Sequence, residues 1–242
     1  MTSLKNRIAV VTGASSGIGA ATVGVLATEG ARVAALGRRA DRLETSGALA
    51  VPTDVRDYAS VDAAAGRVRA ALGRPDLVVA NAGVMLAAAF EKADPSEWQQ
   101  MIDTNLIGLL NTARAFMGDL IATAAEGRPA DLVMIGSISS HVVFPGYAVY
   151  GATKAAVPHL VRHLRAELGP RGVRVHNIDP GLVRTELGEG MLDDSSREQW
   201  VALRGSIEPM EGADIGAAIA WAAAAPLRVN VADMVIVSTQ QG

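Results

Sequence analysis

Tyr150 and Lys154 stand four residues apart and are the pair in this sequence best suited to acid–base chemistry. On a helix, residues at this spacing lie on the same face, one turn apart. A phenol is a poor acid or base near neutral pH, but a nearby ammonium stabilises the phenolate and lowers the pKa of the tyrosine. Such a pair could move a proton to or from a substrate oxygen. By itself the spacing is weak evidence, because a partly buried ring beside a solvated charge has the same pattern.

Two further polar residues, Ser137 and Asn105, fit the same chemistry. Ser137 follows the apolar run 132–135, which is typical of a buried strand, so its hydroxyl can hydrogen-bond an oxygen that Tyr150 also contacts. Asn105 interrupts an apolar helical series. A buried amide needs partners, so Asn105 is either a hydrogen-bonding centre in the core or the holder of an ordered water near the site. These side chains together describe a site for a carbonyl or a carbinol.

A glycine-rich segment, residues 12–19, lies between a predicted strand at 8–11 and a helical pattern that continues through Glu29. This arrangement points free backbone N–H groups and the positive end of a helix at a pyrophosphate. Its three glycines would permit the turn, the close approach of the phosphates and tight helix packing, in that order. The flanking elements favour a phosphate-binding loop over an ordinary glycine turn. The residues of the loop expected to bind the cofactor are Gly13, Ser15, Ser16, Gly17, Ile18 and Gly19.

Arg38 and Arg39 follow the second predicted strand, residues 33–36. In dinucleotide-binding folds the residue at this strand end faces the adenosine ribose, where a carboxylate would accept hydrogen bonds from a 2′-hydroxyl and repel a 2′-phosphate. The sequence has no carboxylate there, and a guanidinium suits a phosphate dianion. We therefore expect NADP in preference to NAD, although surface arginines after a strand also occur without a ligand.

Asp54 and Val55 follow a brief third strand predicted at 49–51. The carboxylate could accept a hydrogen bond from the exocyclic amine of adenine, or it could cap the next helix. The residue type does not decide between these two roles. Residues 40–50 are few for a full crossover helix, so an abbreviated second helix is expected.

Strands and helices alternate along the chain, which predicts an α/β fold with a doubly wound, seven-stranded parallel sheet and helices on both faces. No linker, repeat or low-complexity tract divides the 242 residues, so we expect a single domain, 1–242. The ends of parallel strands should bring the ligand-binding loops to one edge. Later strands are predicted at 76–80, 132–135, 173–178 and 234–237, and helices at 58–72, 95–114 with Asp94 as its N-cap, around Tyr150, and at 212–225.

Composition argues against several other classes of protein. The net charge of -3 and the scattered arginines give no electrostatic footprint for nucleic acid, and the chain contains no cysteine. His159 and His163 have a spacing that could hold a metal, but no third ligand is obvious, so a solvated helix face is favoured. The longest apolar tract, 215–225, is too short to span a bilayer, and the first residues lack a signal-peptide pattern. We expect a cytoplasmic protein with no metal and with no nucleic-acid or membrane partner.

Taken in order along the chain, these motifs resemble those of the short-chain dehydrogenase/reductase family, in its compact form with a single Rossmann fold. Residues 12–19 resemble its cofactor loop and residues 81–83 its Asn-Ala-Gly motif. Asn105, Ser137, Tyr150 and Lys154 resemble its catalytic tetrad. Ala80 departs from the family pattern, which usually has a second asparagine there. The remaining cofactor contacts implied by the resemblance are Asn81, Ala82, Gly83, Tyr150, Lys154, Pro180, Gly181, Val183 and Thr185.

The resemblance implies an NADP(H)-dependent carbonyl reductase or alcohol dehydrogenase, which transfers hydride between nicotinamide and a ketone or secondary alcohol. Tyr150 would be the general acid or base, Lys154 would also bind the nicotinamide ribose, and Asn105 would hold a water. A homodimer or homotetramer formed through the helices near Asn105 and Tyr150 is implied as well. An epimerase or dehydratase of the same family, or an NADP-binding protein without catalysis, is the alternative.

The substrate is expected beside Tyr150, under a lid formed by residues 186–210, a long segment without strong periodicity. Arg184 is a possible clamp for a carboxylate. The other expected pocket residues favour a mostly apolar ketone, and they are His141, Val142, Val143, Phe144 and Tyr147.

Overall fold

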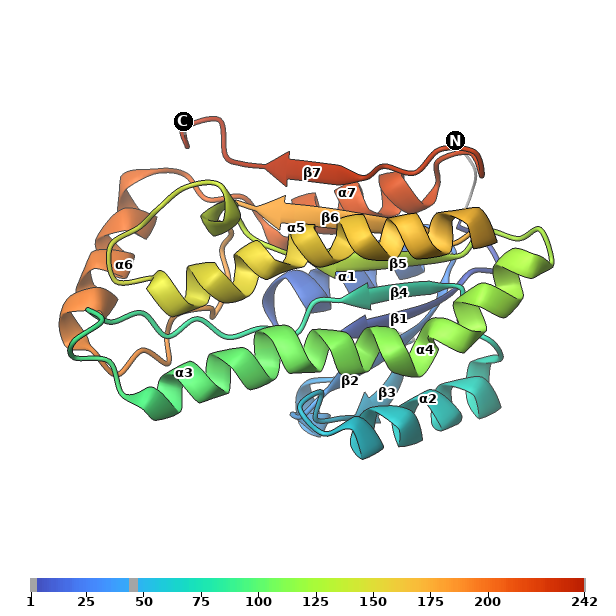
Figure 1. Ribbon diagram of the computed structural model, residues 1–242, viewed down its shortest axis with the longest axis horizontal. Helices are drawn as coiled ribbons and strands as arrows, with labels where there is room; N and C mark the ends of the chain where they lie inside the picture. Colours follow the sequence, from blue (N-terminus) through green and yellow to red (C-terminus); the bar gives the residue numbers. More distant parts are fainter. Residues whose placement is uncertain (1–3, 44–47, 242) are drawn as a thin grey trace.

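The computed structural model describes residues 4–43 and 48–241 of the chain. A seven-stranded parallel sheet runs through this part, with the order β3-β2-β1-β4-β5-β6-β7 and helices on both faces (Figure 1). The predicted doubly wound α/β fold is confirmed. The strands are β1 Ile8–Thr12, β2 Arg32–Gly37, β3 Leu49–Pro52, β4 Leu77–Ala80, β5 Asp131–Ile135, β6 Arg174–Pro180 and β7 Asp233–Ile236.

The strand order determines where a ligand can bind. β1 pairs with β2 on one side and with β4 on the other. The chain therefore builds outward from β1 to β3, returns to the middle at β4 and then builds outward in the other direction to β7. The loops after β1 and β4 diverge at this reversal, and the resulting crevice lies at the carboxyl edge of the sheet.

The helices form one layer on each face of the sheet. Figure 1 shows α4 and α5 in front of the strands and α1 and α7 behind them. Because side chains alternate along a strand, Val10 of β1 packs in the core with α2, α4 and α5, whereas Ala9 and Val11 pack with α1 and α7. The helices are α1 Gly17–Thr28, α2 Tyr58–Leu72, α3 Pro95–Met101, α4 Gly108–Ala125, α5 Ala148–Leu168, α6 Asp194–Ser206 and α7 Gly212–Ala223.

The helix predicted at 95–114 is longer than expected and is not uniform. Asp94 caps it as predicted, accepting a hydrogen bond from Ser96 N at 2.8 Å. α3 then passes without a break into a π-helical turn, η2 Ile102–Ile107, and into α4, which ends at Ala125. Such π-turns frequently occur at functional sites. Asn105 lies within this turn.

Other differences from the sequence-based predictions are local. The abbreviated second helix is a single turn, η1 Ala40–Arg42, while part of that prediction, residues 44–47, lies outside the described residues. α6 lies in the segment expected to be a lid and was not predicted as a helix. Within the described ranges, no helix is long and apolar enough to cross a membrane.

Candidate active site

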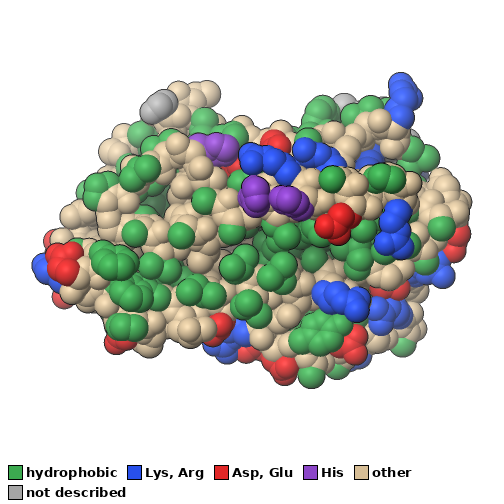
Figure 2. All heavy atoms as spheres, viewed as in Figure 1, with side chains coloured by type: hydrophobic (Ala, Val, Ile, Leu, Met, Phe, Trp, Pro, Cys, Tyr) green, Lys and Arg blue, Asp and Glu red, His purple; other side chains and the backbone are tan. Residues whose placement is uncertain are grey.

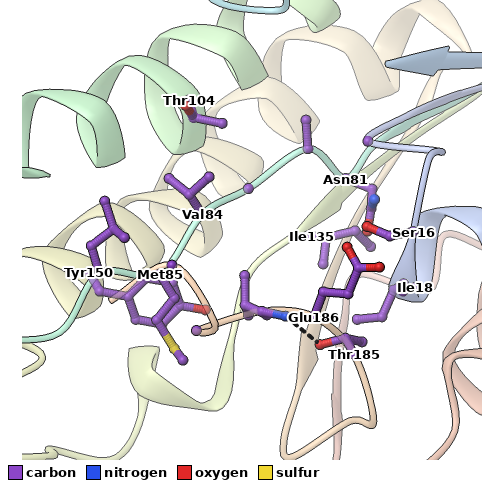
Figure 3. A pocket seen from close by; sticks show the side chains of 18 of the residues that line it. Ser16, Ile18, Asn81, Val84, Met85, Thr104, Ile135, Tyr150, Thr185 and Glu186 are labelled. Atoms are coloured by element: carbon purple, nitrogen blue, oxygen red, sulfur yellow. Dashed lines mark hydrogen bonds between the residues drawn. The ribbon is translucent and has the colours of Figure 1, made fainter. Parts of the chain in front are cut away.

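A cleft of about 610 Å³ opens at the carboxyl edge of the sheet. Figure 3 shows Tyr150 and Met85 toward one end of it, and Ser16 and Ile18 beside Thr185 and Glu186 toward the other. Nearly all predicted site residues line this one cleft. They are Gly13, Ser15, Ser16, Gly17, Ile18, Arg38, Arg39, Asp54, Val55, Asn81, Ala82, Gly83, Ser137, Tyr150, Lys154, Pro180, Gly181, Val183 and Thr185.

Two predicted residues, Gly19 and Asn105, lie behind the cleft wall instead. A Cβ on Gly19 would overlap the carbonyl oxygen of Gly13, so this glycine serves the packing of α1 against the loop, as expected. Gly17 has a φ of +53°, and a Cβ there would lie 2.9 Å from Thr185 Cγ2. The loop therefore needs glycine at both positions to bring its backbone this close to its neighbours.

The Asn-Ala-Gly segment joins the ends of β1 and β4. Thr12 Oγ1 accepts hydrogen bonds from Asn81 N at 3.0 Å and from Ala82 N at 3.2 Å. The Asn81 amide donates to Thr12 O at 2.9 Å. These bonds hold the two diverging loops together at the bottom of the crevice.

Asn105 is 1% exposed and makes three hydrogen bonds. Its Oδ1 accepts from Val84 N at 2.8 Å, and its Nδ2 donates to Val84 O at 2.9 Å and to Thr153 Oγ1 at 3.1 Å. Thr153 in turn donates to Tyr150 O at 2.7 Å. These contacts are those of a hydrogen-bonding centre, the first of the two roles that the sequence left open, and they fix α5 against the cleft wall.

Ser137, Tyr150 and Lys154 come together as the spacing predicted. Each is at least nine-tenths buried, and the Ser137 hydroxyl hydrogen-bonds the phenol of Tyr150. Lys154 Nζ donates to the carbonyl of Ile135 at 2.9 Å. Ile135 at the end of β5 thus contacts Lys154, and Ser137, two residues beyond the strand, contacts Tyr150.

The electrostatics of this pair differ from the expectation. The pKa of Tyr150 is raised to about 12, mainly by burial and in smaller part by Tyr147 and Asp179, while the hydrogen bond from Ser137 opposes the rise. Burial lowers the pKa of Lys154 to about 8, against the charge of Asp179. The predicted lowering of the tyrosine pKa by Lys154 is not seen, because the amine faces the Ile135 carbonyl and loss of solvent dominates.

Arg39, which follows β2, contacts both the glycine-rich loop and Glu186. Arg39 donates to Ser15 and Ser16 of the glycine-rich loop and pairs with Glu186 at 2.9 Å. Arg42 also pairs with Glu186, at 2.7 Å. The carboxylate of Glu186 therefore pairs with Arg39, one of the two arginines expected to hold a phosphate.

Asp54 is not a helix cap. It pairs with Arg56 at 2.6 Å, and this hydrogen-bonded pair holds the pKa of Asp54 below its usual value. The cap of α2 is Asp57, which accepts from Ala59 N at 3.0 Å. Because Asp54 lines the cleft, its other proposed role, accepting a hydrogen bond from the adenine amine, is compatible with this geometry.

The residues that line the substrate end of the cleft differ from those predicted. None of the five residues expected there from the loop before α5 lines the described cleft, and Val143 is 92% exposed. Arg184 pairs with Glu211 at 2.7 Å outside the cleft. The residues that sequence reasoning missed come from the loop after β4 and from α3 and η2, and they are Val84, Met85, Leu86, Ser96, Glu97, Gln100 and Thr104. The segment expected to be a lid does line the cleft, through Glu186, Leu187, Gly188, Glu189, Gly190, Leu192 and Trp200.

A signal for part of this wall was present in the sequence. Ser96, Gln100 and Thr104 are polar and four residues apart, so they share one face of the helix. This wall makes the substrate end more polar than the predicted apolar pocket.

The histidine pair on α5 lies on an exposed face of the helix. The rings of His159 and His163 are 4.8 Å apart and exposed, and Figure 2 shows histidine side chains at the surface. Among the described residues, no group of three His, Asp or Glu side chains could hold a metal ion. The contacts are those of a solvated helix face.

Comparisons with known proteins agree with this geometry. The family described as short chain dehydrogenase matches residues 7–196. An uncharacterized oxidoreductase of Staphylococcus aureus is 35% identical over 243 residues, covering 98% of this chain and 99% of the relative. A serine dehydrogenase complexed with NADP+ has a TM-score of 0.88 at 30% identity and covers 97% of this chain and 96% of its own. An alcohol dehydrogenase from the archaeon Thermococcus sibiricus, complexed with 5-hydroxy-NADP, has a TM-score of 0.85 at 28% identity, with 98% of each chain covered.

Proposed function

Since the chain belongs to the short-chain dehydrogenase family of oxidoreductases, we propose that it transfers hydride between NADP(H) and a ketone or secondary alcohol. The observation that carries the proposal is the convergence of Ser137, Tyr150 and Lys154 in the cleft that the glycine-rich loop also lines. A hydroxyl, a phenol and an amine at one end, with a phosphate-binding loop at the other, are the groups this reaction needs.

The residues around the cleft fit a dinucleotide. Ser16 makes no side-chain cap hydrogen bond to α1, so its hydroxyl does not occupy the backbone N–H groups at the start of the helix, which a phosphate would use. Arg38 and Arg39 would hold the 2′-phosphate, and Pro180 to Thr185 would face the nicotinamide. When bound, the dinucleotide supplies or accepts the hydride. The NADP+ and 5-hydroxy-NADP in two similar structures support NADP as the cofactor.

The side chains account for the proton. In the reducing direction Tyr150 is the acid: the phenolic O–H bond breaks and the proton goes to the substrate oxygen as hydride adds to the carbonyl carbon. Ser137 donates a hydrogen bond that orients this oxygen. The pKa of about 12 keeps Tyr150 protonated before the reaction. In the oxidising direction Tyr150 must lose its proton, and the ammonium of Lys154 would favour that step once it turns toward the phenolate.

The substrate would enter between α3 and residues 186–210, which we propose as the lid. The glycines at 188 and 190 and the helix α6 belong to this segment, and Trp200 of α6 lines the cleft. The polar wall formed by Ser96, Glu97 and Gln100 favours substrates that carry a polar group besides the reacting oxygen. The similar serine dehydrogenase and alcohol dehydrogenase indicate hydroxy acids and simple alcohols as the first compounds to test.

Self-association is proposed through α4 and α5. Ile107 at the end of η2 and Leu110 in α4 are each 38% exposed, and hydrophobic side chains gather on this face (Figure 2). Light scattering should give two or four times the chain mass of 25.0 kDa. A monomer mass at working concentration would contradict this part of the proposal.

The Tyr150→Phe variant tests the reaction itself. Removing the phenolic proton should lower turnover by about 100- to 10,000-fold, the usual contribution of a general acid. Nicotinamide absorbance should be followed with ketones, alcohols and hydroxy acids, using NADP(H) and NAD(H) in turn. Binding of NADP, measured by protein fluorescence, should be retained and serves as the control.

Unchanged turnover in Tyr150→Phe would refute the acid role. A compound that is converted with no net change in nicotinamide absorbance would instead favour an epimerase or dehydratase. Binding of NADP with no conversion of any compound would favour a protein without catalysis.

A further inference from the structure

Asp179, near the carboxyl end of β6, is a buried carboxylate that no step of the reaction uses. Its side chain is 1% exposed. Oδ1 accepts a hydrogen bond from Ser137 N at 2.8 Å, and Oδ2 accepts one from the Asn177 amide at 2.7 Å. His141 Nε2 lies 2.8 Å from Oδ2. One carboxylate thus joins β6 to the catalytic serine and to the loop after η3 Ile138–Ser140.

Gly136 allows the carboxylate to come this close. A Cβ on Gly136 would overlap Asp179 Oδ1. On one side of this glycine, Ile135 O accepts from Lys154 Nζ at 2.9 Å; on the other side, Ser137 N donates to Asp179. The amine of Lys154 and the carboxylate of Asp179 therefore hold the same three-residue segment, 135–137.

The charge of Asp179 acts on both members of the proton-transferring pair. Burial lowers the pKa of Lys154, and the Asp179 carboxylate raises it. Burial also raises the pKa of Tyr150, and Asp179 adds to this rise. His141 is the other titratable group in contact with the carboxylate. On β7 the register partner of Asp179 is the uncharged Val235.

We infer that Asp179 is a positioning residue that holds Ser137 and the loop of His141 in place and serves as the counter-charge of the Tyr150–Lys154 pair. The inference rests on the proposed function. A carboxylate near a buried amine favours its ammonium form, and one near a phenol favours the protonated form. Asp179 thereby favours the ammonium form of Lys154 and adds to the burial that keeps Tyr150 protonated.

The Asp179→Asn variant separates the charge from the hydrogen bonds. The new amide oxygen can accept from Ser137 N as before. Asn177 Oδ1 is buried without a partner in the described chain, so a turn of the Asn177 amide would let it accept from the new NH₂ group. Neutral His141 can accept through Nε2 in one of its two tautomers. The fold should therefore tolerate the change.

The readout is the titration of Lys154, followed by NMR in protein containing isotope-labelled lysine. The chain has three lysines, Lys5, Lys92 and Lys154, so the signal can be assigned with the Lys154→Met variant. Wild-type Lys154 should titrate with a pKa of about 8. In Asp179→Asn its pKa should fall by about half a unit or more, because an anion that favoured the ammonium is gone.

The matched control is Asp233→Asn, which removes one charge from the exposed start of β7 and should leave the titration unchanged. In the pH profile of turnover, both apparent pKa values belong to the coupled pair, and both should move down in Asp179→Asn.

A folded Asp179→Asn protein whose Lys154 titrates as in the wild type would overturn the inference. A variant that fails to fold would also overturn it, because the carboxylate would then serve the fold and not the charge of the site. The titration needs neither cofactor nor substrate. Failure of the proposed function would therefore show as absent turnover with the shift still present.

Discussion

The two edges of the sheet bury charged side chains in opposite ways. At the amino edge, Asp131 is fully buried, and its carboxylate lies 2.7 Å from Arg7 Nη2, 2.8 Å from Arg174 Nε and 2.9 Å from His176 Nε2. Arg7 also pairs with Asp76 at 2.5 Å. At the carboxyl edge, the charged group of Lys154 hydrogen-bonds a neutral carbonyl.

The difference shows what pairing does to a buried charge. Burial alone would raise the pKa of Asp131, but the hydrogen bond and charge of His176 and the charges of Arg7 and Arg174 hold it at about 2. The hydrogen-bond partner of Lys154 is a neutral carbonyl and only the charge of Asp179 opposes burial, so the pKa of Lys154 falls to about 8. The paired cluster is fixed in one protonation state, whereas the unpaired groups are able to exchange protons.

Replacing Asp131 tests this contrast, and we expect it to have the largest effect of the three tests, on the free energy of unfolding. Asp131→Asn leaves two buried arginines without their shared partner, and it should lower the free energy of unfolding by about 3–5 kcal/mol, measured by urea denaturation. Turnover per folded molecule should stay within about twofold, since Asp131 lies at the amino edge of the sheet and Tyr150 and Lys154 act at the carboxyl edge. As a control, Glu126→Gln removes an exposed partner of Arg128 and should change the free energy of unfolding far less, because water screens an exposed ion pair. A loss of turnover in folded Asp131→Asn would contradict the view that the charges at the amino edge serve stability and not catalysis.

The acid stability of the chain gives a second, smaller test. The folded pKa of Asp131 is depressed, so its contribution is fully present above the unfolded value near 4 and is lost as the pH falls through about 2. The difference in unfolding free energy between wild type and Asp131→Asn should therefore shrink by about 2 kcal/mol between about pH 5 and pH 2. A difference that does not depend on pH would mean that Asp131 is not held as a carboxylate.

The third test concerns the cofactor end of the cleft and has the smallest expected effect. Arg39→Gln should weaken NADP binding about tenfold and NAD binding little, because one guanidinium contact to the 2′-phosphate is lost. Glu186→Gln frees Arg39 from an exposed ion pair and should strengthen NADP binding about two- to fivefold. Fluorescence titration with both dinucleotides measures these changes. Equal changes for NADP and NAD would place the 2′-phosphate elsewhere.

Much of the fold could be predicted because strand periodicity and glycine-rich turns are local signals. Residues 12–19, the Asn-Ala-Gly segment and the Tyr-Lys spacing identified groups that now line one cleft. The pairing of Asp179 with His141 could not be predicted, since it joins a residue of β6 to a loop residue 38 positions earlier in the chain. The pKa of Tyr150 depends on burial, which spacing alone does not reveal.

The substrate wall was mispredicted for a related reason. Sequence proximity to Tyr150 placed the loop of Val143 in the pocket, but that side chain points to solvent. The true wall includes α3, whose face toward the cleft depends on the π-turn that follows it. Neither that turn nor α6 has a hydrophobic pattern distinct enough to predict.

The π-helical turn η2 Ile102–Ile107 has a consequence for how this scaffold can vary. One α-helical residue corresponds to about 100° of rotation, so a single-residue deletion there would swing Ser96 and Gln100 of α3 away from the cleft while α4 kept its hold on the core. Lengthening or shortening the turn would thus bring different side chains of α3 to the substrate end of the cleft. The cofactor end would not change. Changes in the length of this turn could therefore alter the substrate side of the cleft during evolution while the cofactor side stayed the same.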